Sequence, residues 1–228
     1  MCFSATADLV VGVALVPVAI AALHEVKHWR EIPFALLPTV FAVHQFIEAA
    51  VWPTAHGVIS PGLVSLAVRA YLFIAMGLLP TLMPISVLML EPRGARMRVV
   101  PFVALGGVVS TYLTYVVLSR PVTVVEHPHA LEYQKAVPNG IVWAVLYIVA
   151  VIGPAVVSGY PSIVAFGLLN LVGLVVVAVV YVQAFASLWC VYAAAASVLV
   201  LGHMIRRRRL ADPHRLRGDP LNSAVPSI

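Results

Sequence analysis

The chain has 228 residues, of which 62% are hydrophobic and only 10% are charged, and its formal net charge is +5. A soluble domain is about half apolar and about a quarter charged, so this composition excludes a water-soluble globular protein and requires lipid to cover much of the surface. The positive charge does not indicate nucleic-acid binding, because basic residues cluster beside the ends of apolar segments, above all at Arg206–Arg209. We therefore expect membrane lipid as the partner and no nucleic acid.

Seven apolar segments are each long enough to cross a bilayer as a helix, at about 20 residues a span. In chain order they cover approximately 7–23, 33–52, 63–90, 99–118, 138–157, 162–183 and 185–205. The last two form one apolar stretch, which we divide near Gln183. The segments lack the alternation of barrel strands, so we predict an all-α, polytopic fold. It comprises a seven-helix transmembrane domain over 1–209 and a polar, disordered cytoplasmic tail over 210–228.

Basic residues set the predicted orientation. They follow the first, third and seventh spans, at Lys27 and Arg30, at Arg93, Arg96 and Arg98, and at Arg206–Arg209. These span ends share one side, which the positive-inside rule makes cytoplasmic. The N-terminus is then outside and the C-terminus inside. The longest outer loop is SRPVTVVEHPHALEYQKAVPN, over 119–139.

The second span carries the stretch FAVHQFIEAAVW, in which His44, Glu48 and Trp52 recur every four residues and so share one helix face. Arg69, early in the third span, lies at a similar depth. Because neither charge is stable alone in lipid, we predict an ion pair between Glu48 and Arg69. Such a pair is either a structural link between two helices or a functional site, in which Glu48 acts as acid, base or ligand and Arg69 tunes it.

Polar and aromatic side chains gather in the predicted outer halves of the spans, whereas the inner halves contain fewer. This asymmetry favours a polar cavity that opens outward. The predicted ligand-binding residues are Ser4, His44, Gln45, Trp52, Tyr115, Trp143, Asn170 and Trp189. The alternative is that these side chains form no cavity and have only structural roles. Ser and Thr can hydrogen-bond to the backbone of their own helix, and Tyr and Trp are common at the membrane interfaces.

Cys2 and Cys190 are the two cysteines of the chain, and the predicted topology puts both near the outer side. Three interpretations stay open. The thiols are inert, they form a disulfide, which persists outside the cytoplasm, or they bind a metal with an imidazole such as that of His129. The spacing matches no established metal motif.

Four stretches, MCFSATAD, HQFIEAAVW, LLPTLMPISVLMLEPR and FASLWCVYAAAAS, resemble an uncharacterised family of bacterial integral membrane proteins whose chains begin MCFS. The family is a domain of unknown function, so the resemblance implies a multi-pass protein of the bacterial cytoplasmic (inner) membrane but no reaction or cofactor. Its pattern falls on Cys2, Ser4, Glu48, Trp52, Pro84, Glu91, Trp189 and Cys190. His44 departs from the glutamine expected there. The resemblance favours a bonded or metal-bound cysteine pair over two inert thiols.

Two functions follow as hypotheses. The first is an outward-facing pocket that binds a small or amphiphilic ligand. The alternative is an intramembrane enzyme that acts on a lipid or isoprenoid, with Glu48 as acid or base and, in one version, a metal held by Cys2 and Cys190. A ceramidase-type hydrolase is disfavoured, because we expect no aspartate in a span core. A transporter is disfavoured because the inner half is apolar and no repeat is evident.

Overall fold

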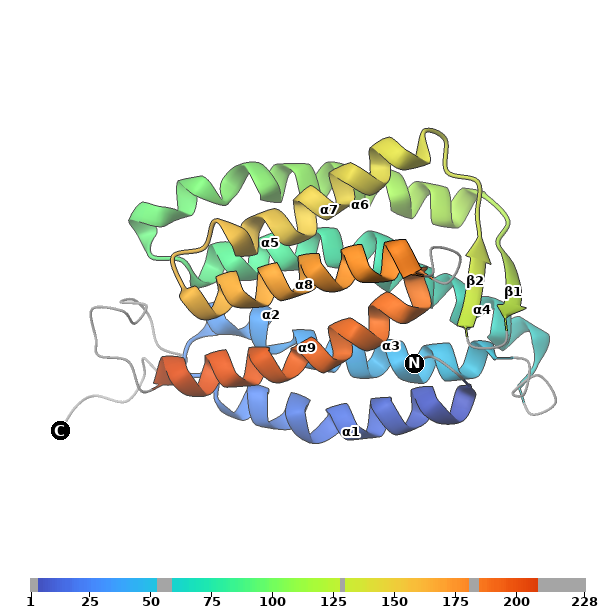
Figure 1. Ribbon diagram of the computed structural model, residues 1–228, viewed down its shortest axis with the longest axis horizontal. Helices are drawn as coiled ribbons and strands as arrows, with labels where there is room; N and C mark the ends of the chain where they lie inside the picture. The colour runs from blue at the N-terminus through green and yellow to red at the C-terminus, as the bar shows by residue number, and fades with distance from the viewer. Residues whose placement is uncertain (1–3, 53–58, 128–129, 181–184, 209–228) are drawn as a thin grey trace.

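The computed structural model describes residues 4–52, 59–127, 130–180 and 185–208 (Figure 1). These residues are mostly helical, as predicted. The helices are α1 (Ala5–His24), η1 (Trp29–Glu31), α2 (Ile32–Ala35), α3 (Leu37–Val51), α4 (Pro61–Leu72), η3 (Phe73–Leu78), α5 (Leu79–Leu90), η4 (Arg93–Arg98), α6 (Val100–Ser119), α7 (Gly140–Val156), α8 (Pro161–Val180) and α9 (Phe185–Arg208).

Four helical segments among the described residues are long and apolar enough to cross a membrane. They are Ala5–His24, Trp29–Val51, Pro61–Leu90 and Val100–Ser119, which correspond to the first four predicted spans. The apolar helices Gly140–Val156 and Pro161–Val176 are shorter. Membrane association is therefore supported by length and composition, while the seven-span count and the orientation of the termini stay predictions.

The loop over 119–139 contains a β-hairpin that the all-α prediction missed. Strand β1 (Thr123–His127) pairs antiparallel with β2 (Ala130–Gln134), with Val125 opposite Glu132. His127 Nε2 lies 2.6 Å from a Glu132 carboxylate oxygen, and this hydrogen bond is the main cause that lowers the pKa of Glu132. The strands are short, and an isolated pair of strands is marginally stable in water, so this hairpin depends on the surrounding helices for its stability.

The long helices run side by side, so the bundle has two distinct ends (Figure 1). Helix α1 packs against α3 and α9, α5 packs against α6 and α7, and α8 packs between α7 and α9. We call the end with the start of α1, the end of α3 and the hairpin the hairpin end. The opposite end, with the turn at 25–31, η4 and the last turn of α9, is the basic end.

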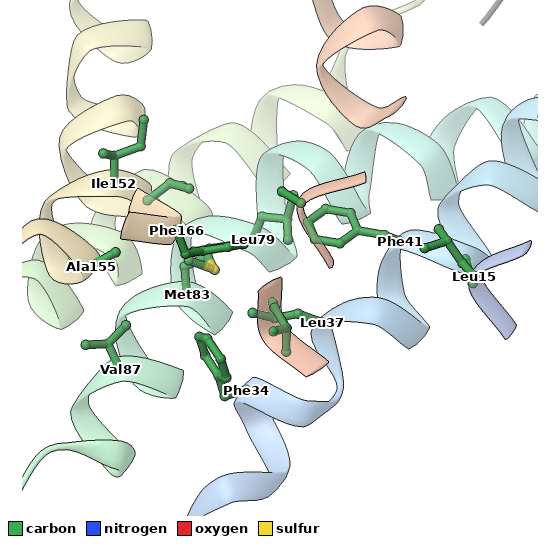
Figure 2. Close-up of a cluster of buried hydrophobic side chains, with 14 of the residues drawn as sticks. Leu15, Phe34, Leu37, Phe41, Leu79, Met83, Val87, Ile152, Ala155 and Phe166 are labelled. Atoms are coloured by element: carbon green, nitrogen blue, oxygen red, sulfur yellow. The ribbon is translucent and has the colours of Figure 1, made fainter. Parts of the chain in front are cut away.

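Apolar side chains fill the interior between the helices. Figure 2 shows Phe34, Phe41, Leu79, Met83 and Phe166 converging from α2, α3, α5 and α8. Large apolar side chains also cover the outer surface of the helices, including Val10, Ile20, Leu66, Val108, Ile141 and Val172. A soluble monomer rarely exposes so much apolar surface, so this surface is compatible with contact to lipid.

The third span is an irregular helix whose backbone is completed by its neighbours. Its middle, η3, is π-helical, a geometry in which the carbonyl of Ala75 would accept from the N–H of residue 80. Pro80 has no N–H, and the Tyr147 hydroxyl donates to the Ala75 carbonyl instead, at 2.8 Å. The Ser110 hydroxyl donates to the carbonyl of Gly77 in the same way. Because a bare carbonyl is costly in lipid, these bonds fix α6 and α7 against the third span.

Helices α5 and α6 approach each other closely at Gly106. Pro84 lacks the N–H that would bind the carbonyl of Pro80, and a Cβ added at Gly106 would collide with that carbonyl oxygen. At the adjacent Gly107 an added Cβ would meet nothing within 4 Å. The Gly106 backbone therefore sets the distance between the two helices, as small residues do in membrane bundles.

We expect Gly106→Ala to destabilise the detergent-purified protein by roughly 1–3 kcal/mol, because overpacking forces the two backbones apart. Gly107→Ala is the matched control and should change stability by no more than about 0.5 kcal/mol. Thermal unfolding of both variants measures the difference. Equal effects at the two positions would contradict the close approach.

Candidate functional site

A buried polar centre lies between α1 and α3 toward the hairpin end. Asp8 of α1 and His44, Gln45 and Glu48 of α3 are completely buried, and Trp52, just after α3, is 3% exposed. Gln45, Glu48 and Trp52 recur at spacings that place them on one side of the helix. Ionisable side chains in a membrane span are costly to bury and commonly mark functional sites. The helix face predicted from the sequence is therefore buried as a group.

His44 connects this centre to the third span and to the hairpin. Its Nε2 lies 3.0 Å from the carbonyl oxygen of Tyr71, which can only accept, so Nε2 carries the proton. The imidazole also stacks on the Tyr71 ring, with centroids 4.0 Å apart, and Tyr71 stacks on Tyr133 of β2 at 4.5 Å. The remaining ring nitrogen, Nδ1, is a buried acceptor without a hydrogen-bond partner.

Asp8 is a member of this centre that the sequence prediction missed. Its Oδ2 accepts a hydrogen bond from the Trp52 indole nitrogen at 2.7 Å, across 44 residues of sequence. We expected no aspartate in a span core from the sequence, and Asp8 lies at the start of the first span. The structure buries it there, in the first turn of α1, where the helix dipole favours a negative charge.

The side chain of Gln45 lacks the hydrogen bonds that a buried amide normally makes. Both amide atoms, Nε2 and Oε1, are buried and have no hydrogen-bond partner. Burying an amide without partners costs on the order of 1–3 kcal/mol. A native structure keeps such a group only when something else requires it.

Glu48 and Arg69 differ in their surroundings. Glu48 is completely buried, whereas Arg69 is exposed. The pKa of Lys135 is lowered, mainly by burial of its ammonium group and further by the positive charges of Arg69 and Arg120. Arg69 therefore lies near Lys135. The ion pair between Glu48 and Arg69 stays a prediction.

Three other predicted ligand-binding residues lie elsewhere. The Ser4 hydroxyl accepts from the Ala7 backbone N–H at 3.2 Å and caps α1. Tyr115 is 66% exposed on α6, and the half-buried Trp143 stacks on Tyr112 at 3.8 Å. None of these contacts joins Ser4, Tyr115 or Trp143 to the side chains of the buried centre.

Asn170 is buried in α8, where its amide donates to the carbonyl of Phe166 at 2.7 Å. It lines a small cavity of about 20 Å³ together with the core residues Phe41 and Met83. The structure therefore places Asn170 in the middle of the bundle, separate from the contacts of Asp8 and His44.

The predicted metal ligands cannot be placed in the same way. Cys2 and His129 lie outside the described residues, as do the side chains of Trp189 and Cys190. Among the side chains that are described, no group of three or more His, Cys, Asp and Glu residues is arranged to hold a metal ion. The cysteine pair stays a prediction.

The basic end holds a second buried polar network, which the sequence prediction also missed. Glu31 accepts from Arg207 Nε at 2.9 Å and from the backbone N–H groups of Lys27 and His28. The partner of Glu31 lies 176 residues away, so sequence spacing gives no sign of it.

Glu91 joins a second pair of segments at the basic end. Its Oε1 accepts from the Ser158 hydroxyl at 2.6 Å and from the Gly159 N–H at 2.7 Å, and Arg98 lies 3.6 Å from Oε2. These bonds tie the end of α5 to the turn between α7 and α8. Glu91 is one of the positions that match the family pattern, and this match was the sign in the sequence that Glu91 is important.

We expect Trp52→Phe to destabilise the protein by roughly 1–3 kcal/mol, because it removes a donor from the buried Asp8 carboxylate. Trp29→Phe, at a position 43% exposed, is the control and should cost no more than about 0.5 kcal/mol. Thermal unfolding in detergent compares the two. If both substitutions cost the same, the bond between Trp52 and Asp8 contributes nothing specific.

Residues 1–216 match a family described as a family of unknown function, DUF6629. No curated protein and no solved structure matches the chain. The match includes the stretches around Glu48 and Glu91, and thus both buried networks. Because it covers 216 of the 228 residues, the chain belongs to the family of unknown function DUF6629.

Proposed function

We propose that this chain is an integral protein of the bacterial cytoplasmic membrane that binds a small or amphiphilic ligand at the buried centre between α1 and α3. The basic residues that follow the first, third and seventh predicted spans support an arrangement of seven helices with the basic end in the cytoplasm and the hairpin end outside. The observation that carries the proposal is Gln45, whose buried amide lacks every hydrogen-bond partner. A ligand that pairs with this amide offsets the cost of burying it.

The groups around the centre define the chemistry of the ligand. Asp8 and Glu48 supply carboxylate acceptors, and His44 Nδ1 supplies a further buried acceptor. Gln45 alone offers both a donor and an acceptor. The site is therefore suited to a ligand rich in N–H or O–H donors, such as an amine or a polyol headgroup, and unsuited to an anion.

Tyr71 and Tyr133 cover one side of this centre by stacking in series on His44. Since His44, Gln45 and Glu48 are all completely buried, the structure corresponds to a closed state. Ligand entry requires the hairpin residue Tyr133 to move away from Tyr71. This movement gives the hairpin a role in ligand access from the outer side.

A second candidate is the intramembrane enzyme, with Glu48 as acid or base. The specific observation in its favour is a pair of completely buried carboxyl groups, Asp8 and Glu48, on two helices that pack together. Two such groups in different surroundings can divide the roles of proton donor and acceptor. The substrate of this enzyme is the same amphiphilic ligand.

We expect Gln45→Leu to abolish ligand binding while it stabilises the ligand-free protein by about 1–3 kcal/mol, because the unpaired amide is gone. Mass spectrometry of molecules that co-purify, and thermal unfolding after their removal, measure the two effects. The control is Gln134→Leu, the same chemical change at an exposed position. A Gln45→Leu protein that keeps its ligand, or whose ligand-free form is less stable, contradicts the proposal.

Glu48→Gln separates binding from chemistry. If Glu48 only binds, the variant loses the co-purified molecule or retains the same molecule as the unsubstituted protein. If Glu48 is an acid or base, the variant retains an unconverted precursor that differs in mass from the molecule on the unsubstituted protein. Mass spectrometry of the two extracts therefore decides between the two candidate functions.

A further inference from the structure

A cavity of about 340 Å³ lies at the basic end of the bundle. It is bordered by the end of α5, η4, the turn between α7 and α8, and the last turns of α9. This volume falls at the lower end of the range for small-molecule sites. Among the side chains that the structure describes, the ionisable groups in its wall are Glu91, Arg98, His203, Arg206 and Arg207.

Arg207 is the residue that points to a ligand. It is only 3% exposed, and its Nε donates to Glu31 at 2.9 Å. The guanidinium lies 5.1 Å from the centre of the Tyr160 ring. Its two terminal nitrogens, Nη1 and Nη2, are buried and have no hydrogen-bond acceptor. Because Glu31 binds the Nε of this arginine, its two terminal nitrogens can still donate side by side to a planar or tetrahedral oxyanion.

His203 supplies further hydrogen-bonding capacity one turn before Arg207. Its Nδ1 lies 2.7 Å from the Ser162 hydroxyl, and both residues line the cavity. Its Nε2 is buried without a partner. Phe34 and Tyr160 contact the imidazole edge to face, so the ring is held in place. The Ser162 hydroxyl can donate either to this ring or to a ligand oxygen.

The net charge of the wall favours an anion. Among the described side chains, Arg98, Arg206 and Arg207 carry positive charges, against the carboxylates of Glu91 in the wall and of Glu31 behind Arg207. Glu91 Oε1 accepts from Ser158 and Gly159, and its Oε2 faces Arg98, so this carboxylate has its own partners. Arg98 is half exposed, which allows it to move toward a ligand.

From this arrangement we propose that the basic-end cavity binds a phosphate group, either of an anionic phospholipid headgroup or of a free phosphorylated molecule. Arg207 is the buried anchor, with Arg98 and Ser162 as its partners around the oxyanion. The cavity lies where the helices end, so a lipid headgroup and a soluble phosphate can both reach it. This site shares no residue with the centre at Gln45.

The test uses the full chain in nanodiscs. In one arm, protein in phosphatidylcholine nanodiscs is titrated with inorganic phosphate and the binding heat is measured. In the other, nanodiscs with and without phosphatidylglycerol are compared by native mass spectrometry of the released protein. Saturable phosphate binding in the first arm supports a soluble phosphate. Retained phosphatidylglycerol with no response to phosphate supports the lipid headgroup.

Two variants address the site. Arg98→Gln should weaken binding by about tenfold, the equivalent of one charge-assisted hydrogen bond. Arg207→Met alone would leave Glu31 buried and unpaired, so the double variant Glu31→Gln/Arg207→Met removes both charges and should abolish binding. Its unfolding temperature in phosphatidylcholine reports whether it is folded.

Arg30→Gln is the matched control, since Arg30 lies at the basic end but does not line the cavity. It should change affinity by no more than about twofold. Absence of binding in both arms overturns the proposal. An equal loss in Arg30→Gln and Arg98→Gln also overturns it, because the anion would then respond to surface charge alone.

Discussion

The requirement that every backbone polar group be satisfied in lipid is the constraint on which this structure depends. The third span meets it with help from other helices, since Pro80 cannot supply its own N–H. Tyr147 of α7 binds the carbonyl of Ala75, and His44 of α3 binds that of Tyr71. The same contacts that complete the backbone therefore hold α3 and α7 against the third span.

One of these contacts also prepares the candidate site. His44 must carry its proton on Nε2 to reach the Tyr71 carbonyl, which leaves Nδ1 as an acceptor in the buried centre. The contact with the third span thus fixes the tautomer of His44. Because Tyr71 in turn stacks on Tyr133, the state of the hairpin is linked to the surroundings of His44.

The two ends of the bundle are built for opposite charges. Toward the hairpin end, the carboxyl groups of Asp8 and Glu48 and the amide of Gln45 are completely buried. At the basic end, the carboxylates of Glu31 and Glu91 accept donors from segments distant in sequence, and the terminal nitrogens of Arg207 are left without an acceptor. A donor-rich ligand at one end and a phosphate at the other would therefore bind without competition.

The sequence by itself determined the membrane class, the helical character, the positions of the first four spans and the buried face of Glu48, because hydropathy and helical periodicity are local properties. Only the tertiary structure decided that Asp8 meets Trp52, that Glu31 meets Arg207, and that two short strands pair over Tyr71. Each of these contacts joins segments that are brought together by helix packing, and their spacing in the sequence carries no periodic signal. The pairing of buried polar groups is a property of the folded bundle, whereas the need to bury them is already present in the chain.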